Sequence, residues 1–170
     1  LLDNANHPFV PLRKEINLLE LYLSLENLRI PDLKYCIEID PSIDSNKITI
    51  PNMMLQPYIE NAIWHGLSHK KGERNLKIRI TRQHDNIVCE VEDNGVGRKM
   101  ATELKSLYRK EHRSRGMELL SKRFSLLSKE YGSDIQTGIE DLHDNGTATG
   151  TRITIIVPSS LTEQFKTVYS

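Results

Sequence analysis

Hydrophobic residues recur every three or four positions in three stretches of this chain, which is the spacing of one face of a helix. In the first stretch they are Leu12, Ile16, Leu19 and Leu23. Pro11 precedes this stretch, where a helix start tolerates proline, and Pro31 follows it. We therefore predict an amphipathic helix over residues 12–28, with a polar face formed by Lys14, Glu15 and Glu20.

The other two stretches predict two further helices. Over residues 53–67 the apolar positions form a helical stripe that leaves Glu60, Asn61 and His65 partly on another side. Polar groups would then lie along one edge of a buried helix. Over residues 117–131 the spacing is again helical, and Gly132 stands where a residue in the left-handed conformation commonly ends a helix.

Shorter segments alternate apolar and polar residues, as strands with one buried face do. We predict strands over residues 33–40, 47–50, 76–80, 87–91, 134–140 and 151–157. A turn at residues 84–86 would join the third and fourth strands into a hairpin, and the last two strands would form another. Strands and helices alternate without regular repeats, so we expect an α/β sandwich with a mixed sheet and helices packed on one face.

Composition is that of an ordinary globular domain. The chain has 170 residues, 38% of them hydrophobic, and a formal net charge of zero, which argues against a nucleic-acid binder with a basic face. No run approaches the roughly 18 apolar residues of a membrane span, so we expect a domain of cytosolic character. Cys36 and Cys89 lie in predicted strands without metal-ligand spacing, and we expect buried, reduced thiols. The start at Leu1 predicts a piece of a longer protein.

A carboxylate followed by two glycines ends the fourth predicted strand, in the run Asp93-Asn94-Gly95-Val96-Gly97. The second predicted helix carries the run Glu60-Asn61-Ala62-Ile63-Trp64-His65-Gly66. A carboxylate at a strand end can seat the amino group of a purine, while glycines let the backbone bend around the ligand. The two runs together predict an ATP site. For the first run taken alone, an exposed Asp-Asn-Gly turn is the alternative.

Basic residues are frequent between Gly97 and Gly116. They are Arg98, Lys99, Arg109, Lys110, Arg113 and Arg115. A basic loop bounded by glycines has the composition of a lid that closes over phosphates. The alternative is a solvated loop with ordinary surface charge.

These motifs, in this order, resemble the ATP-binding catalytic domain of LytS-type sensor histidine kinases, within the superfamily shared with gyrase and MutL. The resemblance runs from Val10 to Pro158, and residues 51–66 resemble the family's N-box. It implies a Bergerat ATP-binding fold over residues 31–160, a two-layer α/β sandwich with a mixed, mostly antiparallel sheet and helices on one face. Residues 1–30 would end an upstream dimerisation or connector region, or form a terminal helix packed on the sheet. Residues 161–170 would be a C-terminal tail.

The resemblance also implies roles for single residues. Asn61 resembles the N-box asparagine that holds Mg²⁺ at the triphosphate, a role that suits a neutral oxygen ligand, although a capping or core amide is the alternative. Asp93 resembles the aspartate that reads adenine, and Gly95 and Gly97 allow close approach of the backbone. Further ATP contacts are implied for His65, Arg115, Gly116, Gly150 and Thr151.

Several of these assignments have alternatives. His65 could line the nucleotide site or serve only in packing. Gly150 and Thr151 could belong to a plain hairpin. Glu60 would be catalytic if it orients the water shell of the metal or assists phosphoryl transfer, but it could equally pair with a lid arginine.

Departures from the family pattern limit the expected activity. No phospho-acceptor histidine precedes Pro11, so this chain alone should not phosphorylate itself. Trp64 stands where many histidine kinases carry a phosphate-contacting lysine, and Glu118 replaces the second glycine of the lid closure. Pro57 stands where related ATPases carry the glutamate that activates water, which argues against ATP hydrolysis.

The implied function is that of a protein-histidine kinase in a two-component system. With ATP and Mg²⁺, the domain would transfer the γ-phosphate to a histidine on an upstream dimerisation segment of the same protein, for relay to a response regulator. The full-length protein would be a homodimer anchored in the cell membrane, with this domain in the cytoplasm. The alternatives are a nucleotide-binding regulatory module that has lost catalysis and an ATP-hydrolysing conformational clamp.

Overall fold

The computed structural model describes residues 8–99 and 114–163. In chain order the elements are β1 (Phe9–Pro11), α1 (Leu12–Arg29), β2 (Leu33–Ile39), β3 (Thr49–Pro51), α2 (Gln56–Asn61), the π-helical turn η2 (Ala62–Leu67), β4 (Arg74–Gln83), β5 (Asn86–Asp93), α4 (Ser114–Tyr131), β6 (Gln136–Asp144), β7 (Thr147–Val157) and α5 (Ser159–Glu163). Every predicted helix and strand is present, with ends shifted by a few residues. The short elements β1 and α5 were not predicted.

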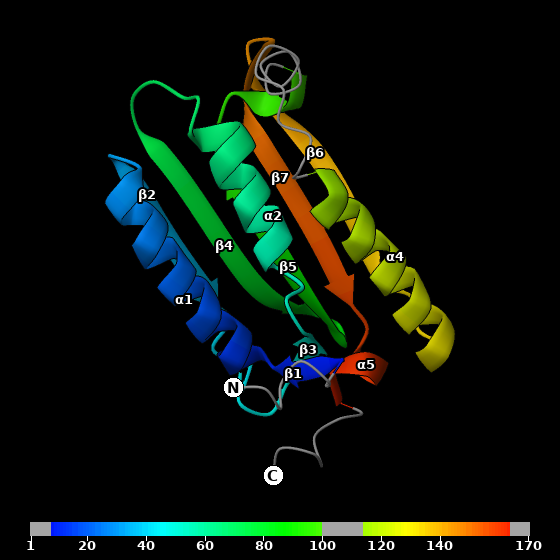
Figure 1. The fold of residues 1–170 in the computed structure, drawn as a ribbon. Coiled ribbons are helices and arrows are strands. Elements are labelled where there is room, and N and C mark those ends of the chain that lie inside the picture. The colour runs from blue at the N-terminus through cyan, green and yellow to red at the C-terminus, as the bar shows by residue number, and fades with distance from the viewer. Residues whose placement is uncertain (1–7, 100–113, 164–170) are drawn as a thin grey trace.

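The main sheet has five strands in the order β2-β4-β5-β7-β6. Strands β2 and β4 are parallel, and the other neighbours are antiparallel. Helices α1, α2 and α4 all lie on one face of this sheet, while β1, β3 and α5 gather at one end of it (Figure 1). The predicted fold class, a two-layer sandwich with a mixed and mostly antiparallel sheet, is therefore confirmed.

Helix α1 packs into the same hydrophobic core as the sheet. Its predicted apolar stripe is at most 1% exposed at Leu12, Ile16, Leu19 and Leu23. Full burial of one such side chain stabilises a fold by roughly 1.5–3 kcal/mol, so this face holds the helix firmly on the sheet. Whether residues 1–30 belong to an upstream connector region stays a prediction.

Two predictions about burial are wrong. Glu15 was placed on the polar face of α1, yet it is 1% exposed, because it lies on the buried stripe three residues after Leu12 and four before Leu19. Cys36 was expected to be buried, but it is exposed, whereas Cys89 is buried; both thiols are free. Cys36 alternates along β2 with Tyr35 and Ile37, which face the core, so it lies on the outer face of the sheet.

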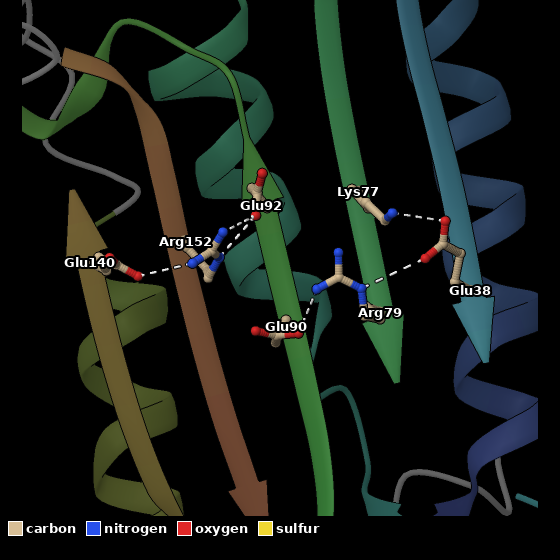
Figure 2. A network of polar contacts seen from close by, with 7 residues as sticks. All are labelled: Glu38, Lys77, Arg79, Glu90, Glu92, Glu140 and Arg152. Atoms are coloured by element: carbon tan, nitrogen blue, oxygen red, sulfur yellow. Dashed lines mark hydrogen bonds and ion pairs between the residues drawn. The ribbon is translucent and has the colours of Figure 1, made fainter. Parts of the chain in front are cut away.

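The outer face of the sheet carries rows of opposite charges (Figure 2). Arg79 on β4 bonds Glu90 on β5 at 2.9 Å, and Arg152 on β7 lies 2.8 Å from Glu92 on β5. The row continues on the outer strands through the pairs Lys77 with Glu38 and Arg152 with Glu140. Such exposed cross-strand pairs add little stability, and they give this face of the sheet a charged surface. In the part of the chain that the structure describes, no helix has both the length and the apolar character to cross a membrane.

Residues with a left-handed backbone conformation form the hairpin turns and end one helix. Gly132, predicted as the cap of α4, has φ +66° and follows the last helical residue, Tyr131. The β4–β5 hairpin turns at His84, with φ +54°, and the β6–β7 hairpin turns at Asn145 and Gly146, both with positive φ. Two-residue hairpin loops favour this conformation, which fixes the register of both strand pairs.

Candidate functional site

The helix that carries Asn61 changes its winding at that residue. α2 ends at Asn61 and continues as η2, where the N–H of Ser68 donates to the carbonyl of Ile63, five residues back, at 2.8 Å. Helical turns of this wider kind occur frequently at functional sites. Tyr58, Ile59 and Ile63 face the core, as predicted, and the polar edge with Asn61 points the other way.

A small cavity lies along this polar edge. It is lined by Pro57, Glu60, Asn61, His65, Gly116 and Met117, and its volume is about 20 Å³, the room of roughly one water molecule. The first turn of α4 thus meets the middle of the α2–η2 helix across more than fifty residues of chain. Three predicted polar residues and the predicted Gly116 come together here. Glu60 is held in place by Gln56, whose Nε2 donates to Oε1 at 2.9 Å.

Asp93, a buried polar residue of β5, packs against Gly66 near the C-terminal end of η2. It is the last residue of β5, pairs with Thr151 on β7, and is 4% exposed. The N–H of Gly95 donates to its Oδ1 at 2.8 Å. Among the described residues, no hydrogen bond to Oδ2 is present, so this oxygen can accept one from a ligand.

Three glycines pack so closely around Asp93 that no larger residue fits. A Cβ on Gly66 would lie 2.6 Å from Oδ1 of Asp93, and one on Gly95 would lie 2.4 Å from the backbone of Gly66. A Cβ on Gly150 would lie 1.9 Å from the carbonyl oxygen of Asp93. These contacts bring the end of η2, the loop after β5 and the middle of β7 together around one carboxylate. The predicted site residues Gly150 and Thr151 are therefore beside Asp93.

Gly97 completes this loop. Its φ of +78° is one that glycine adopts readily, and a Cβ at this position would lie 2.9 Å from the Cβ of Ala148 on β7. The N–H of Val96 donates to the carbonyl of Gly66 at 3.2 Å, which ties the loop to η2.

Burial dominates the electrostatics of Asp93. Desolvation raises its pKa to about 6, against the lowering effects of the Gly95 N–H and of the Lys70 ammonium. Lys70 also donates to the backbone carbonyl of Asn94. A desolvated carboxylate with one oxygen available is a strong acceptor for an amino group, which is the chemistry predicted for adenine recognition.

The residues around the cavity fit Mg²⁺ only as part of a shared coordination shell. Within residues 8–99 and 114–163, no group of three or more His, Cys, Asp or Glu side chains could hold a metal ion by itself. The amide oxygen of Asn61 is a neutral ligand of the kind that Mg²⁺ accepts beside waters and phosphates. The donor set therefore fits an ion that takes most of its ligands from water or from a bound anion.

Comparison with known proteins shows what the chain and its fold are similar to. The chain is 34% identical over 162 residues to the sensor protein LytS of Oceanobacillus iheyensis. The alignment covers 92% of this chain and 26% of that protein. The catalytic domain of the histidine kinase ThkA, in a nucleotide-free form, superimposes with a TM-score of 0.55 at 16% identity over 89% of this chain and 94% of that one. No protein-family model matches.

The chain is related to the LytS-type sensor proteins and has the fold of a histidine kinase catalytic domain. It spans about a quarter of the length of the LytS protein that it matches. The structure of ThkA in complex with the response regulator TrrA is also similar, with a TM-score of 0.57 at 12% identity over 89% of this chain and 41% of that one.

The two departures from the usual histidine kinase pattern have a structural explanation. Trp64 is partly buried against the core, and the guanidinium of Arg29 on α1 lies 4.0 Å above its ring. Glu118 is exposed and accepts a hydrogen bond from Lys122, one turn later on α4, at 2.7 Å, so its charge is paired. Trp64 therefore has a packing role in this LytS relative, and the charge of Glu118 is partly neutralised.

Part of the predicted basic lid lies outside the described residues. This holds for Arg109, Lys110, Arg113 and the side chain of Arg115. Arg98 is described, and its guanidinium makes two 2.7 Å hydrogen bonds to Asp141 on β6. Arg98 directly follows Gly97, but its charge is already paired with Asp141 in this structure.

Three charged residues near the site were missed in the sequence. Glu15 and Arg123 hold the segment that leads into α2, and Lys70 lies beside Asp93. The helical spacing of α1 could have predicted the role of Glu15, because it places this residue on the apolar stripe, where a carboxylate needs a buried partner. Arg123 follows Gly116 by seven residues, which places both on one face of α4. No sequence pattern marked Lys70.

Proposed function

We propose that this chain is the ATP-binding catalytic domain of a two-component sensor histidine kinase. The observation that carries the proposal is that one helix joins two chemically different places. Asn61 in its middle faces Gly116 across a small cavity, and Gly66 at its end packs against the buried Asp93. A nucleotide needs this combination of an acceptor for its base and a neutral oxygen ligand near its phosphates.

At the base end, the Oδ2 atom of Asp93 would accept a hydrogen bond from the amino group of adenine. Because Gly66, Gly95 and Gly150 carry no Cβ, three backbone segments pack directly against Asp93 and hold its carboxylate in one position for this bond. Thr151, which pairs with Asp93 across the strands, would contact the ring from β7.

At the phosphate end, Asn61 would offer its amide oxygen to the metal, and His65, one turn later, would line the site. The backbone at Gly116, in the first turn of α4, would face the phosphate oxygens. When bound, Mg²⁺ supplies positive charge that offsets the charge of the triphosphate. Glu60, held by Gln56, would order water at this end.

Phosphoryl transfer of this kind depends on positioning and charge rather than on covalent chemistry of the domain. The attacking atom would be a ring nitrogen of a histidine outside this chain, and ADP would leave as the bond to the γ-phosphorus breaks. Pro57 has no group that can activate water and lies on the cavity wall, which favours transfer over hydrolysis.

The further partners follow from the same proposal. The histidine would lie on an upstream segment of a homodimeric, membrane-anchored protein, and the phosphoryl group would pass to the aspartate of a response regulator. The ThkA complex with TrrA, a response regulator protein, supports this last partner.

A second candidate is a nucleotide-binding regulatory module without catalysis. It is favoured by Trp64, which packs under Arg29 where a lysine would reach a phosphate. Labelled phosphate on the full-length protein separates the two candidates: incorporation into a histidine supports the kinase, and tight Mg-ATP binding without any incorporation supports the regulatory module.

Isothermal titration with ATP, with and without Mg²⁺, tests the binding site. The Asn61→Ala variant should lose at least about 10-fold in affinity in the presence of Mg²⁺, as expected when a metal ligand or its support is removed. Its matched control is Asn17→Ala, on the exposed face of α1, which should bind as the wild type does. If Mg²⁺ raised the ATP affinity of Asn61→Ala as much as that of the wild type, Asn61 would not be a metal ligand.

A further inference from the structure

Glu15 connects α1 to the start of the helix that carries Asn61. Its two carboxylate oxygens accept hydrogen bonds from the N–H groups of Met53, at 2.9 Å, and Leu55, at 3.1 Å. Leu55 directly precedes α2, where the start of a helix leaves donors without partners inside the helix, and Met53 lies two residues earlier. α2 has no cap from a side chain of its own N-terminal residue, Leu55. Glu15 therefore supplies the cap from another element.

Arg123 reaches the same place from α4. Its guanidinium donates to the carbonyl oxygen of Asn52 and, at 3.1 Å, to that of Pro8. Burial raises the pKa of Glu15, and the N–H groups of Leu55 and Met53 and the positive charge of Arg123 oppose that rise. Arg123 is partly buried itself, so each charge offsets the desolvation of the other.

The two helices that meet here also meet at the candidate metal site. α2 and α4 are in contact and run in opposite directions (Figure 1). Gly116 lies on the same face of α4 as Arg123, two turns earlier, and it lines the cavity with Asn61. α2 and α4 therefore meet at the cavity, and Arg123, two turns further along α4, holds the segment that leads into α2.

We propose that Glu15 and Arg123 are positioning residues that set the place of Asn61 relative to Gly116. Neither residue lines the cavity. Glu15 fixes the start of α2 against α1, and Arg123 fixes Asn52, in the segment just before α2, against α4, so the residues one to two turns later keep their distance from Gly116. The proposal deepens the proposed function and rests on it for the role of Asn61 as the metal ligand.

Substitution of Glu15 by Gln tests the proposal because the side chain keeps its size and loses its charge. In Glu15→Gln, one amide N–H₂ would face a backbone N–H, so part of the cap is lost. We expect the Mg²⁺-dependent gain in ATP affinity to fall about 10-fold, the effect typical of groups that orient a metal ligand. ATP affinity without Mg²⁺, which depends on the Asp93 end, should stay within about twofold of wild type.

The matched control is Glu20→Gln, an exposed carboxylate on the same helix. A second variant, Arg123→Gln, removes the charge from the α4 side and should give the same selective loss, while Arg123→Lys should recover part of it. Equal loss of affinity with and without Mg²⁺ in both Glu15→Gln and Arg123→Gln would overturn the proposal, because that is the signature of a general loss of folded protein.

Hydrogen exchange of the nucleotide-free protein gives a reading that does not depend on ATP. Loss of the cap should speed amide exchange over residues 53–61 roughly 5- to 10-fold in Glu15→Gln, with β4 and β5 unchanged. Unchanged exchange over residues 53–61 would refute the proposal. If the wild-type domain binds no Mg-ATP, the proposed function fails, and the exchange result still decides whether Glu15 holds this helix.

Discussion

Asp93→Asn should make the nucleotide-free domain more stable and weaken its binding of ATP. The carboxylate is 4% exposed, and burial raises its pKa from an ordinary 3.8 to about 6. Since each pH unit corresponds to about 1.4 kcal/mol, the ionised form costs the folded state roughly 3 kcal/mol at neutral pH. Asparagine has nearly the same shape, carries no charge and keeps an oxygen for the N–H of Gly95.

The sign of the pH dependence follows from the direction of this pKa. A raised pKa means that the folded state holds the proton more tightly than the unfolded state, so the cost is absent below about pH 4 and complete above about pH 6. The stability advantage of the variant should therefore grow from near zero at pH 4 to at most roughly 3 kcal/mol at pH 7.

Binding should change in the opposite direction. Removing the charged acceptor leaves the adenine amino group poorly matched, at a cost of about 1–3 kcal/mol, or roughly 5- to 150-fold in affinity. In the wild type, affinity should also fall as the pH drops below about 6, because the protonated carboxyl is a weaker acceptor. This part of the pH dependence should disappear in Asp93→Asn.

Urea denaturation between pH 4 and pH 8, together with calorimetric ATP titration at the same pH values, measures both effects. Asp40→Asn is the control of opposite sign, because the N–H of Ser42 lowers the pKa of Asp40 and its ionised form favours folding above that pKa. An Asp93 variant no more stable than wild type at pH 7, or an advantage that does not change with pH, would show that the carboxylate is not desolvated as described.

Two further substitutions have clear expectations. Gly150→Ala would place a Cβ 1.9 Å from the carbonyl oxygen of Asp93, at a backbone φ of +148°. We therefore expect the free energy of unfolding, measured by denaturation, to fall by more than about 2 kcal/mol, and ATP binding to be lost. Gly138→Ala, on β6, is its control, because a Cβ there would have nothing within 4 Å. Arg152→Ala breaks exposed ion pairs on the outer face, so stability should fall by at most about 1 kcal/mol, and a larger change or any loss of ATP affinity would contradict the assignment of the site to the other face.

Much of the fold was predictable because each element follows one period. The alternation along β4 and β5 and the spacing of Leu12 to Leu23 depend on one buried face, which a single sequence shows directly. β1 and α5 were not predicted because three and five residues are too few to show a period. The π-helical turn after Asn61 was not predicted either, since a stripe of apolar residues fits an α-helix and a mixed helix almost equally well.

The parts of the candidate site that lie within a sequence motif were predictable. Asn61, Gly116 and His65 were expected in one place and line one cavity, and Asp93 was expected beside glycines and has them. What the motifs do not contain is the support from elsewhere in the chain. The partner of Trp64 is Arg29, thirty-five residues earlier, and no local pattern connects them.

The misplaced Glu15 shows why such support matters for function. A buried carboxylate on an apolar stripe costs free energy unless other groups compensate it, so its presence there calls for partners, which are the N–H groups at the start of α2 and Arg123. α1 also contacts the far end of the same helix, where Arg29 lies over Trp64. Asn61 lies between these two contacts, so the position of the proposed metal ligand depends on α1 on both sides.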